Sequence, residues 1–248
     1  MPSPRRTLVV GDVHGCLAEL EALLGEAAYA PAHDRLVFLG DLLDRGPDPV
    51  GVLRLVRELG ATCVMGNHEE KHLRYAAHEA RRREDPTYRN PMRLDARQAG
   101  EHARLTREEL LWLAGLPRWV SLGGGWVAVH AGFVPRVRLT EQPPDWAIRL
   151  RYVDAAGSPV SRTRGDAGEP GVRPWAAAWT GPESVVYGHF PQQLDLPKRD
   201  EPSPGVVCLG IDTGCVYGGR LTALVLPGAE IVQVPSRSRP ARVAEAED

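Results

Sequence analysis

Lysine is almost absent from this chain. Lys71 and Lys198 are the only lysines among thirty basic residues, so arginine supplies nearly all of the positive charge. We assign this skew to coding bias and not to a function. The formal net charge is −2. Because tight binding to a phosphate backbone usually requires a clear basic excess, nucleic acid is not an expected partner.

Cysteine and long apolar runs are also scarce. The four cysteines are Cys16, Cys63, Cys208 and Cys215, and no two of them form a Cys-x-x-Cys pair. Their spacing argues against a structural zinc site or a disulfide framework and fits a reducing compartment. No run is long enough to span a bilayer, and residues 1–6 contain no signal-peptide core. We therefore expect a cytoplasmic protein without a membrane partner.

What the chain does contain is an ordinary globular composition, 43% apolar and 25% charged over 248 residues. Apolar runs at 7–10, 35–39 and 62–65 each end at a glycine, and segments with helical spacing follow the first two. Three strand-to-loop units in succession predict an α/β fold, organised as an α+β sandwich with mixed central β-sheets flanked by helices. Further strands are expected at 126–129, 185–187 and 206–211, with a closing hairpin at 221–226 and 231–234.

The remaining segments suggest how the chain is divided. We expect one domain at 1–235, in which residues 69–113 form a helical, charged stretch. Residues 133–184 are rich in Pro, Gly, Arg and Trp without clear periodicity, which predicts an inserted cap or substrate-side region. Residues 236–248 are charged and small, which predicts a disordered tail.

Five short clusters of metal-capable residues recur along the chain, each next to glycine and most at the end of an apolar run. In open α/β sheets, ligand sites gather at the loops beyond the carboxyl ends of the strands. A single Asp-x-His is often only a surface turn, but five clusters together can supply the ligands of a two-metal hydrolytic site. The clusters lie at Gly11–Gly15, Gly40–Gly46, Gly66–Glu69, His130–Gly132 and Gly188–His189.

In their order, these clusters resemble those of the calcineurin-like metallophosphoesterases, in the branch of phosphoprotein phosphatases and bacterial symmetrical diadenosine tetraphosphate hydrolases. The resemblance extends from Thr7 to about Pro235 and implies a metallophosphoesterase-like fold with its site at the strand carboxyl ends. It also implies two metal ions with Asp41 bridging them. The implied ligands are Asp12, His14 and Asp41 for the first ion, and Asp41, Asn67, His130 and His189 for the second.

The residue types agree with this implication on chemical grounds. Carboxylate oxygen combined with imidazole nitrogen suits manganese, iron, zinc or cobalt better than calcium or magnesium. We expect two divalent metal ions, with Mn²⁺ as the first choice and Fe, Zn or Co as alternatives. Two cations about 3.5–4 Å apart can activate water and neutralise charge on phosphoryl oxygens.

The resemblance also assigns catalytic roles. His68 follows the ligand Asn67 and would point toward the bond that breaks, so it is the candidate general acid. Asp44 is implied to hydrogen-bond this histidine and keep it protonated, and Arg45 to bind phosphate oxygens. A second phosphate-binding arginine is expected between the last two clusters, where we choose Arg151 and keep Arg149 as the alternative.

The expected substrate is less sharply defined than the chemistry. The runs at 186–190 and 210–224 are similar both to symmetrical diadenosine tetraphosphate hydrolases and to bacterial protein phosphatases. Our first expectation is hydrolysis of diadenosine tetraphosphate to two ADP by a metal-bridging hydroxide. The alternative is a serine/threonine or broad-specificity protein phosphatase, because the chain is short for holding a second adenosine. A third possibility, of another class, is a metal-binding scaffold without catalysis; the sequence does not define the oligomeric state.

Several other residues invite a functional interpretation that we do not adopt. Cys16 follows the first cluster and Cys215 follows Asp212-Thr213-Gly214, which would place both near the metals as oxidation-sensitive thiols, but we expect two small buried side chains. Residues 81–83, three arginines, are expected to be a solvated helix face. We interpret the tryptophans of the insert, Trp146, Trp175 and Trp179, as packing residues in preference to base-stacking ones. Solvated surface histidines are expected at His33, His72, His78 and His102.

Overall fold

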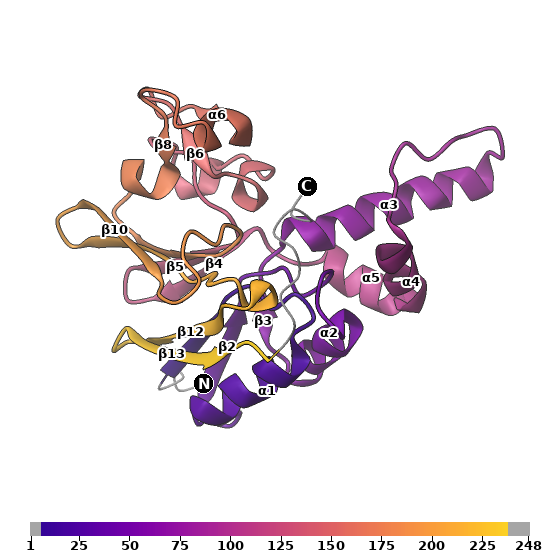
Figure 1. The fold of residues 1–248 in the computed structure, drawn as a ribbon, viewed down its shortest axis with the longest axis horizontal. Helices are drawn as coiled ribbons and strands as arrows, with labels where there is room; N and C mark the ends of the chain where they lie inside the picture. Colours follow the sequence, from indigo (N-terminus) through magenta and orange to yellow (C-terminus); the bar gives the residue numbers. More distant parts are fainter. Residues whose placement is uncertain (1–5, 238–248) are drawn as a thin grey trace.

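The structure is a computed structural model that describes residues 6–237. Figure 1 shows sheets at the centre and helices at the side. The predicted disordered tail falls almost entirely outside the described residues. The helices are α1 (Leu17–Glu26), α2 (Pro49–Glu58), α3 (Asn67–Glu84), α4 (Ala96–Arg104), α5 (Arg107–Ala114) and α6 (Arg162–Asp166), with short 3-10 helices η1 (Leu139–Glu141), η2 (Trp146–Ile148), η3 (Trp175–Ala178) and η4 (Cys215–Tyr217).

The first sheet carries the predicted succession of parallel strands. β1 pairs in parallel with β2, with Val10 opposite Phe38, and antiparallel with β12, with Thr7 opposite Leu226. Because β1, β2 and β3 run in parallel, their carboxyl ends meet at one edge of the sheet. In spatial order the strands are β13 (Glu230–Pro235), β12 (Arg220–Leu226), β1 (Arg6–Val10), β2 (Asp34–Phe38) and β3 (Thr62–Cys63).

A second mixed sheet supplies the later strands. β9 pairs in parallel with both β5 and β11, so these three strands also end at a common edge. In spatial order the strands are β10 (Lys198–Ser203), β11 (Val206–Gly210), β9 (Ser184–Tyr187), β5 (Trp126–Val129) and β4 (Trp119–Gly123). A small third sheet in the insert has the order β7 (Pro159–Val160), β6 (Tyr152–Val153) and β8 (Arg173–Pro174).

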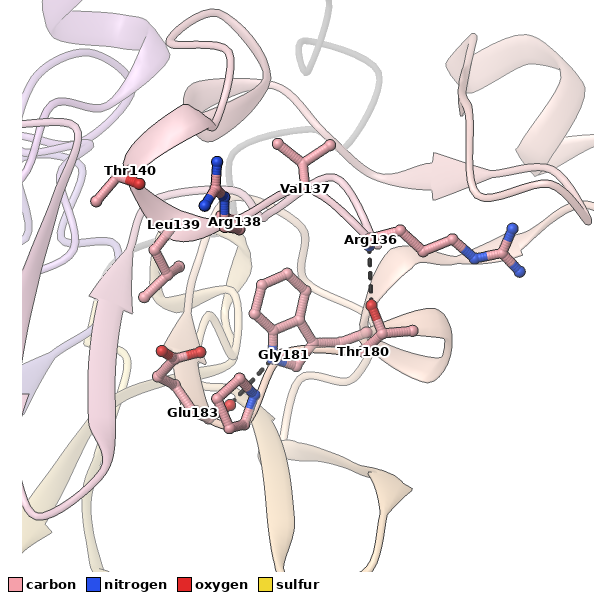
Figure 2. Close-up of a pocket in the computed structure, with 10 residues that line it drawn as sticks. Arg136, Val137, Arg138, Leu139, Thr140, Thr180, Gly181 and Glu183 are labelled. Carbon is pink, nitrogen blue, oxygen red and sulfur yellow. Dashed lines mark hydrogen bonds between the residues drawn. The ribbon is translucent and has the colours of Figure 1, made fainter.

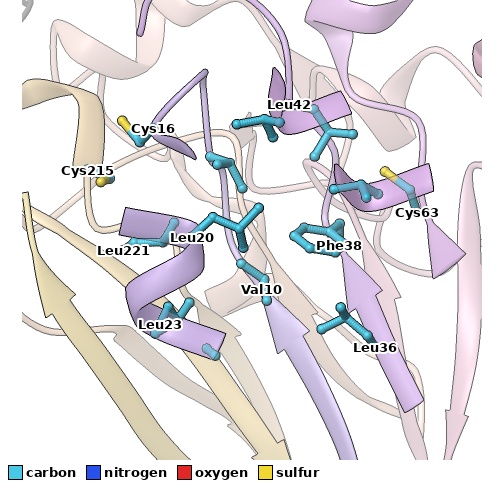
Figure 3. Close-up of a cluster of buried hydrophobic side chains, with 14 of the residues drawn as sticks. Val10, Cys16, Leu20, Leu23, Leu36, Phe38, Leu42, Cys63, Cys215 and Leu221 are labelled. Carbon is cyan, nitrogen blue, oxygen red and sulfur yellow. The ribbon is translucent and has the colours of Figure 1, made fainter. Parts of the chain in front are cut away.

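The two large sheets pack face to face; their central strands are buried on both sides, whereas the edge strands β4, β10 and β13 are partly exposed. Alternation along β1 sends Leu8 and Val10 into a cluster with α1 and α2, whereas Val9 packs with Ala128 and Val186 of the second sheet. This explains why these strands read as continuous apolar runs. Figure 3 shows part of the helix-side cluster, with Leu20 of α1 close to Val10. The mixed sheets flanked by helices that the sequence predicts are therefore present.

The charged stretch at 69–113 is helical, in three pieces. The predicted capping box opens α5, since the Thr106 hydroxyl accepts from the Glu109 N–H at 3.1 Å and the Glu109 carboxylate accepts from the Thr106 N–H at 2.8 Å. A second capping box, between Asp95 and Gln98, opens α4. Figure 1 shows α4 and α5 folded back beside α3, which returns these helices toward the sheet edge.

Candidate functional site

The five clusters converge at the common edge where the parallel strands end. Asp12 and His14 follow β1, and Asp41 follows β2. Several of these positions have a left-handed backbone, with φ of 44° at His14, 49° at Asp41 and 69° at His189. Such backbone costs free energy in residues other than glycine and persists only where its surroundings hold it.

Asp41 lies at the centre and presents its two carboxylate oxygens to two groups of side chains. Its Oδ2 is 3.4 Å from His14 Nε2 and 3.9 Å from His68 Nε2. Its Oδ1 is 3.5 Å from His130 Nε2. Asp41 thus belongs to two separate groups of metal-capable residues, one with His14 and His68 and one with His130 and His189.

The second of these groups is compact. Asn67 Oδ1 lies 2.9 Å from both His130 Nε2 and His189 Nδ1, and the two histidine nitrogens are 3.2 Å apart. His130 Nδ1 lies 2.7 Å from the Leu39 carbonyl oxygen. In a neutral His130 the proton is on Nδ1 and is donated in a hydrogen bond to this carbonyl, which leaves the Nε2 lone pair directed toward Asn67 and His189. A carbonyl partner of this kind commonly orients a metal-binding histidine.

The first group has the same construction around His14. Its Nδ1 lies 2.8 Å from the Leu43 carbonyl oxygen, and its Nε2 accepts a hydrogen bond from Arg45 Nη1 at 2.6 Å. Burial lowers the pKa of His14, and the Arg45 charge lowers it further, so the imidazole is neutral as metal binding requires. Asp12 lies nearby, and its carboxylate accepts the His189 backbone N–H at 2.9 Å.

These donor sets fit divalent cations. Burial raises the pKa of Asp12, and the neighbouring Asp212 and Asp41 raise it further because the carboxylates repel one another. A bound cation would offset the repulsion between these carboxylates and would accept the nitrogen lone pairs of the nearby histidines. The identity of the metal is not defined by the donor set, which is compatible with several first-row ions.

Glu69 holds the loop that carries Asp41. From the first turn of α3, its carboxylate accepts four backbone N–H groups, those of Asp41, Leu42, Leu43 and Gly66, at 2.8–3.1 Å. These bonds fix the left-handed backbone at Asp41. Glu69 belongs to the third cluster of metal-capable residues, but its role in holding this loop was not predicted from the sequence.

His68 is held by Asp44, as the resemblance implies. His68 Nδ1 lies 2.5 Å from Asp44 Oδ2. Burial alone would lower the pKa of His68, but the carboxylates of Asp41 and Asp44 outweigh it, so the net shift is upward. Burial would raise the pKa of Asp44, but hydrogen bonds from His68 and His72 outweigh that effect, and Asp44 stays ionised.

The prediction that His72 is a solvated surface histidine is wrong. It is fully buried, and its Nε2 lies 3.3 Å from Asp44 Oδ1. Gln98 Nε2 donates to Asp44 Oδ2 at 3.1 Å, and the Asp44 backbone N–H donates to Glu101 at 3.0 Å. Since residues four apart share a helix face, the spacing of His72 from His68 was the available signal.

The other three histidines that were expected at the surface lie outside the five clusters. His33 is exposed, and His78 is half-buried with its Nδ1 2.5 Å from the Tyr88 hydroxyl. His102 is half-buried and stacks on His72, with ring centroids 5.4 Å apart.

The two candidate arginines of the insert face different partners. Arg151 Nε donates to His189 Nε2 at 3.2 Å, and its guanidinium lies over the Phe190 ring at 5.2 Å. Arg149 instead pairs with Glu70 of α3 at 2.5 Å. Arg151 therefore lies next to the central cluster and Arg149 is engaged elsewhere. The guanidinium of the third candidate, Arg45, lies over the Tyr217 ring at 5.6 Å from its centroid.

The tryptophans of the insert mostly pack, as expected. Trp175 and Trp179 are buried with Phe133, whereas Trp146 is 37% exposed. A cavity of about 450 Å³ is lined by Trp179 together with residues 136–140 and 180–183. Figure 2 shows residues 136–140 facing the segment that carries Thr180 and Glu183. The Trp179 indole N–H donates to the Glu183 carbonyl oxygen at 3.0 Å, which turns the ring edge into the protein.

Similarity to known proteins shows which family this chain belongs to. A model of the calcineurin-like phosphoesterases matches residues 5–193. The chain belongs to this family. The family implies divalent metal ions, for which this chain has candidate metal-binding groups, and this phosphoesterase is a metal-dependent hydrolase of phosphoric esters or anhydrides.

Two relatives cover most of the phosphoesterase. The symmetrical bis(5'-nucleosyl)-tetraphosphatase of Methylococcus capsulatus is 31% identical over 282 residues, covering 92% of this chain and 94% of the relative. The asymmetrical bis(5'-nucleosyl)-tetraphosphatase PrpE of Bacillus subtilis is 32% identical over 241 residues, covering 92% and 93%. The family-level prediction is therefore confirmed.

Solved structures agree on the fold. The crystal structure of a protein inferred to be a diadenosine tetraphosphatase superposes with a TM-score of 0.76 at 32% identity, covering 94% of this chain and 96% of that one. A serine/threonine phosphatase from Saccharomyces cerevisiae has a TM-score of 0.56 at 12% identity, covering 96% of this chain and 81% of that one, and shares the fold alone. Within residues 6–237, no helix combines the length and the apolar character needed to cross a membrane.

Proposed function

We propose that this phosphoesterase hydrolyses dinucleoside tetraphosphates at the site centred on Asp41. The observation that carries the proposal is the placement of Asp41, whose oxygens face His14 at 3.4 Å and His130 at 3.5 Å. Relatives that cover more than nine tenths of the chain are named for this activity.

The metal ligands in this proposal are those expected from the sequence. Asp12, His14 and Asp41 would hold one ion, and Asp41, Asn67, His130 and His189 the other, with Mn²⁺ as the first choice. When bound, two such cations supply an activated water and neutralise charge on the phosphoryl group. The neutral state that burial imposes on His14 and His189 supports their role as ligands.

His68 is the proposed proton donor to the leaving oxygen. Its short contact with Asp44 and its raised pKa both favour the imidazolium form that a general acid requires. Asp44 is in turn held by His72, Gln98 and its backbone bond to Glu101. This support restricts the His68 ring to one orientation.

Arg45 and Arg151 are the proposed phosphate-binding residues. They reach the central cluster at different histidines, Arg45 at His14 and Arg151 at His189. A guanidinium presents several N–H donors in a fixed plane that suits phosphate oxygens. Between them, the two side chains would clamp the phosphoryl group in line for attack.

Two positions of cleavage are open to a dinucleoside tetraphosphatase. The sequence predicts symmetrical cleavage to two ADP, and the Methylococcus relative carries that description. Asymmetrical cleavage to AMP and ATP is the second candidate. It is favoured by the shorter alignment with the Bacillus enzyme, 241 against 282 residues for the same 92% of this chain, which requires fewer gaps.

The test is product analysis after incubating manganese-loaded protein with diadenosine tetraphosphate, alongside phosphate release from a phosphopeptide. Asp41→Asn is the matched control, since it removes the shared ligand. ADP as sole product supports symmetrical cleavage, and AMP with ATP supports asymmetrical cleavage. Fast phosphopeptide release with little dinucleotide turnover would replace the proposal with a protein phosphatase. Loss of all turnover in manganese-loaded protein would favour a binding scaffold.

A further inference from the structure

Two cysteines that lie far apart in the sequence meet next to the loops that carry the proposed metal ligands. Cys16 directly precedes α1 and Cys215 opens η4. Their sulfur atoms and a carboxylate oxygen of Glu19 all lie within 4.8 Å of one another. Figure 3 shows both cysteines side by side at one edge of the helix-side cluster. Both thiols are reduced and buried, Cys16 fully and Cys215 to within 2%.

Both cysteines lie close in the sequence to residues of the candidate site, so a small movement of either cysteine can be passed on to that site. Cys16 is two residues beyond His14, and Cys215 is three residues beyond Asp212. The intervening Gly15 is closely packed, because a Cβ there would lie 2.8 Å from Pro49. η4 is flanked by left-handed glycines, with φ of 63° at Gly214 and 90° at Gly218. The turn at 214–218 is closely packed as well, since Cys215, Val216 and Tyr217 are all buried, so neither segment can take up a change in the sulfur–sulfur distance by itself.

We propose that Cys16 and Cys215 are an oxidisable thiol pair that closes to a disulfide with hydrogen peroxide and reversibly weakens metal binding. Of the other two cysteines, Cys63 of β3 lies across the helix-side cluster from the pair (Figure 3), and Cys208 of β11 belongs to a different cluster. The pairing is thus specific to these two side chains.

The chemistry needs one molecule of peroxide. Cys16 can react first, and exchanging the two thiols leaves the products unchanged. Its sulfur attacks one peroxide oxygen, the O–O bond breaks, and a sulfenic acid and water result. The Cys215 sulfur then attacks the Cys16 sulfur, the S–O bond breaks, and the departing hydroxide takes the Cys215 proton as a second water. Burial of both thiols makes this slow.

The consequence for the site follows from geometry. A disulfide has an S–S bond of about 2.05 Å, so the two sulfurs must approach and their backbones must adjust. Because both segments are closely packed, part of that adjustment falls on the segment at 14–16. His14 is displaced from its place opposite Asp41, and the affinity for the first metal falls by about tenfold or more, as is typical when the support of a ligand is disturbed.

The test uses the full chain with Cys63→Ser and Cys208→Ser, which leaves the pair as the only thiols. Hydrogen peroxide is added to manganese-loaded and to chelated protein, and thiols are then counted after denaturation. We expect two thiols to become none, with an intramolecular Cys16–Cys215 peptide found by mass spectrometry. Manganese affinity, measured by calorimetry after peroxide removal, should fall by about tenfold and recover with dithiothreitol.

Matched variants separate this proposal from simple damage and from the proposed function. Cys16→Ser and, should it fail to fold, Cys215→Ala should keep their manganese affinity after peroxide. Retention of both thiols in the oxidised protein, a disulfide between two chains, or a disulfide with unchanged metal affinity would each overturn the proposal. Because thiol count and metal affinity are measured without substrate, failure of the tetraphosphatase assay leaves these outcomes unaffected.

Discussion

At the scale of single residues, the active centre depends on which side chain each polar atom faces. His68 faces both Asp41 and Asp44, and its pKa is raised by both carboxylates. Arg151 touches His189, whereas Arg149, two positions earlier, pairs with Glu70. These differences between neighbouring positions lead to two predictions.

The first concerns proton delivery by His68. His68→Asn should reduce cleavage of alkyl phosphomonoesters by about 10²–10⁴-fold, because an alkoxide leaving group needs a proton. Cleavage of anhydrides should fall much less, because ADP leaves as a stabilised anion. Steady-state rates on both substrate types measure the difference. Equal losses on both would contradict the general-acid role.

The second concerns the choice of arginine. Arg151→Ala should lower kcat/KM for diadenosine tetraphosphate by about 10–100-fold, as expected for loss of a charged hydrogen bond. Arg149→Ala is the matched control and should change it little, since its ion pair with Glu70 is partly exposed. The opposite ranking in kinetic assays would reassign the phosphate-binding role to Arg149.

At the scale of secondary-structure elements, α3 does more than carry Asn67 and His68. Through Glu69 it also fixes the loop after β2, because one carboxylate accepts four backbone N–H groups. The site thus depends on a bond between a helix start and a neighbouring strand end.

Replacing that carboxylate should destabilise the loop. In Glu69→Gln the amide NH₂ must face backbone N–H donors, so the free energy of unfolding should fall by about 2–4 kcal/mol. Urea unfolding of metal-free protein measures this. Glu70→Gln, the next residue on the partly exposed side, is the control. An unchanged midpoint in Glu69→Gln would show that the loop is held by other contacts.

An ion pair joins the start of β1 to the start of β2. Arg6 donates to Asp34 at 3.0 and 2.6 Å, and this hydrogen bond holds the pKa of Asp34 below its ordinary value of 3.8. A depressed carboxyl pKa stabilises the fold above about pH 4 and loses that effect as pH falls through the folded-state value.

Asp34→Asn should therefore lower stability at neutral pH but match the parent once the pH has fallen below the folded-state pKa of Asp34. Chemical unfolding at a series of pH values measures the difference between the two proteins. Arg6→Gln should reproduce the same window. A difference that persists unchanged at low pH would mean that Asp34 acts through packing and not through its charge.

At the scale of the whole molecule, the site joins both sheets. Asp41 and Asn67 come from the first sheet, and His130 and His189 from the second. A cation shared by these residues would therefore tie the two layers of the sandwich together.

Metal binding should accordingly raise thermal stability. At about 100-fold above its Kd, a bound ion contributes about 2.7 kcal/mol, which corresponds to a rise in Tm of about 5–10 °C for a chain of this size. Thermal melts with Mn²⁺ and with a chelator measure this. Asp41→Asn should lose most of the shift; the same shift in that variant would place the bound ions elsewhere.

Local patterns made much of this molecule predictable. The apolar runs that end in Gly-Asp, Gly-Asn or a histidine specify both the strands and the side chains that follow them, and the capping box at Thr106 specifies a helix start. The surroundings of Asp44 were not predictable in this way. Gln98 and Glu101 reach it only because α4 folds back beside α3, and no local pattern encodes that return. The meeting of Cys16 with Cys215 depends likewise on the antiparallel pairing of β1 with β12.

That pairing has a consequence for synthesis of the protein. β1 is made well before β12, one of its two partners in the sheet. Until β12 has left the ribosome, one edge of an apolar strand has no partner, and the sheet cannot close around it. Folding of the sandwich must therefore wait for β12, and the nascent protein presents an open strand edge to chaperones until then.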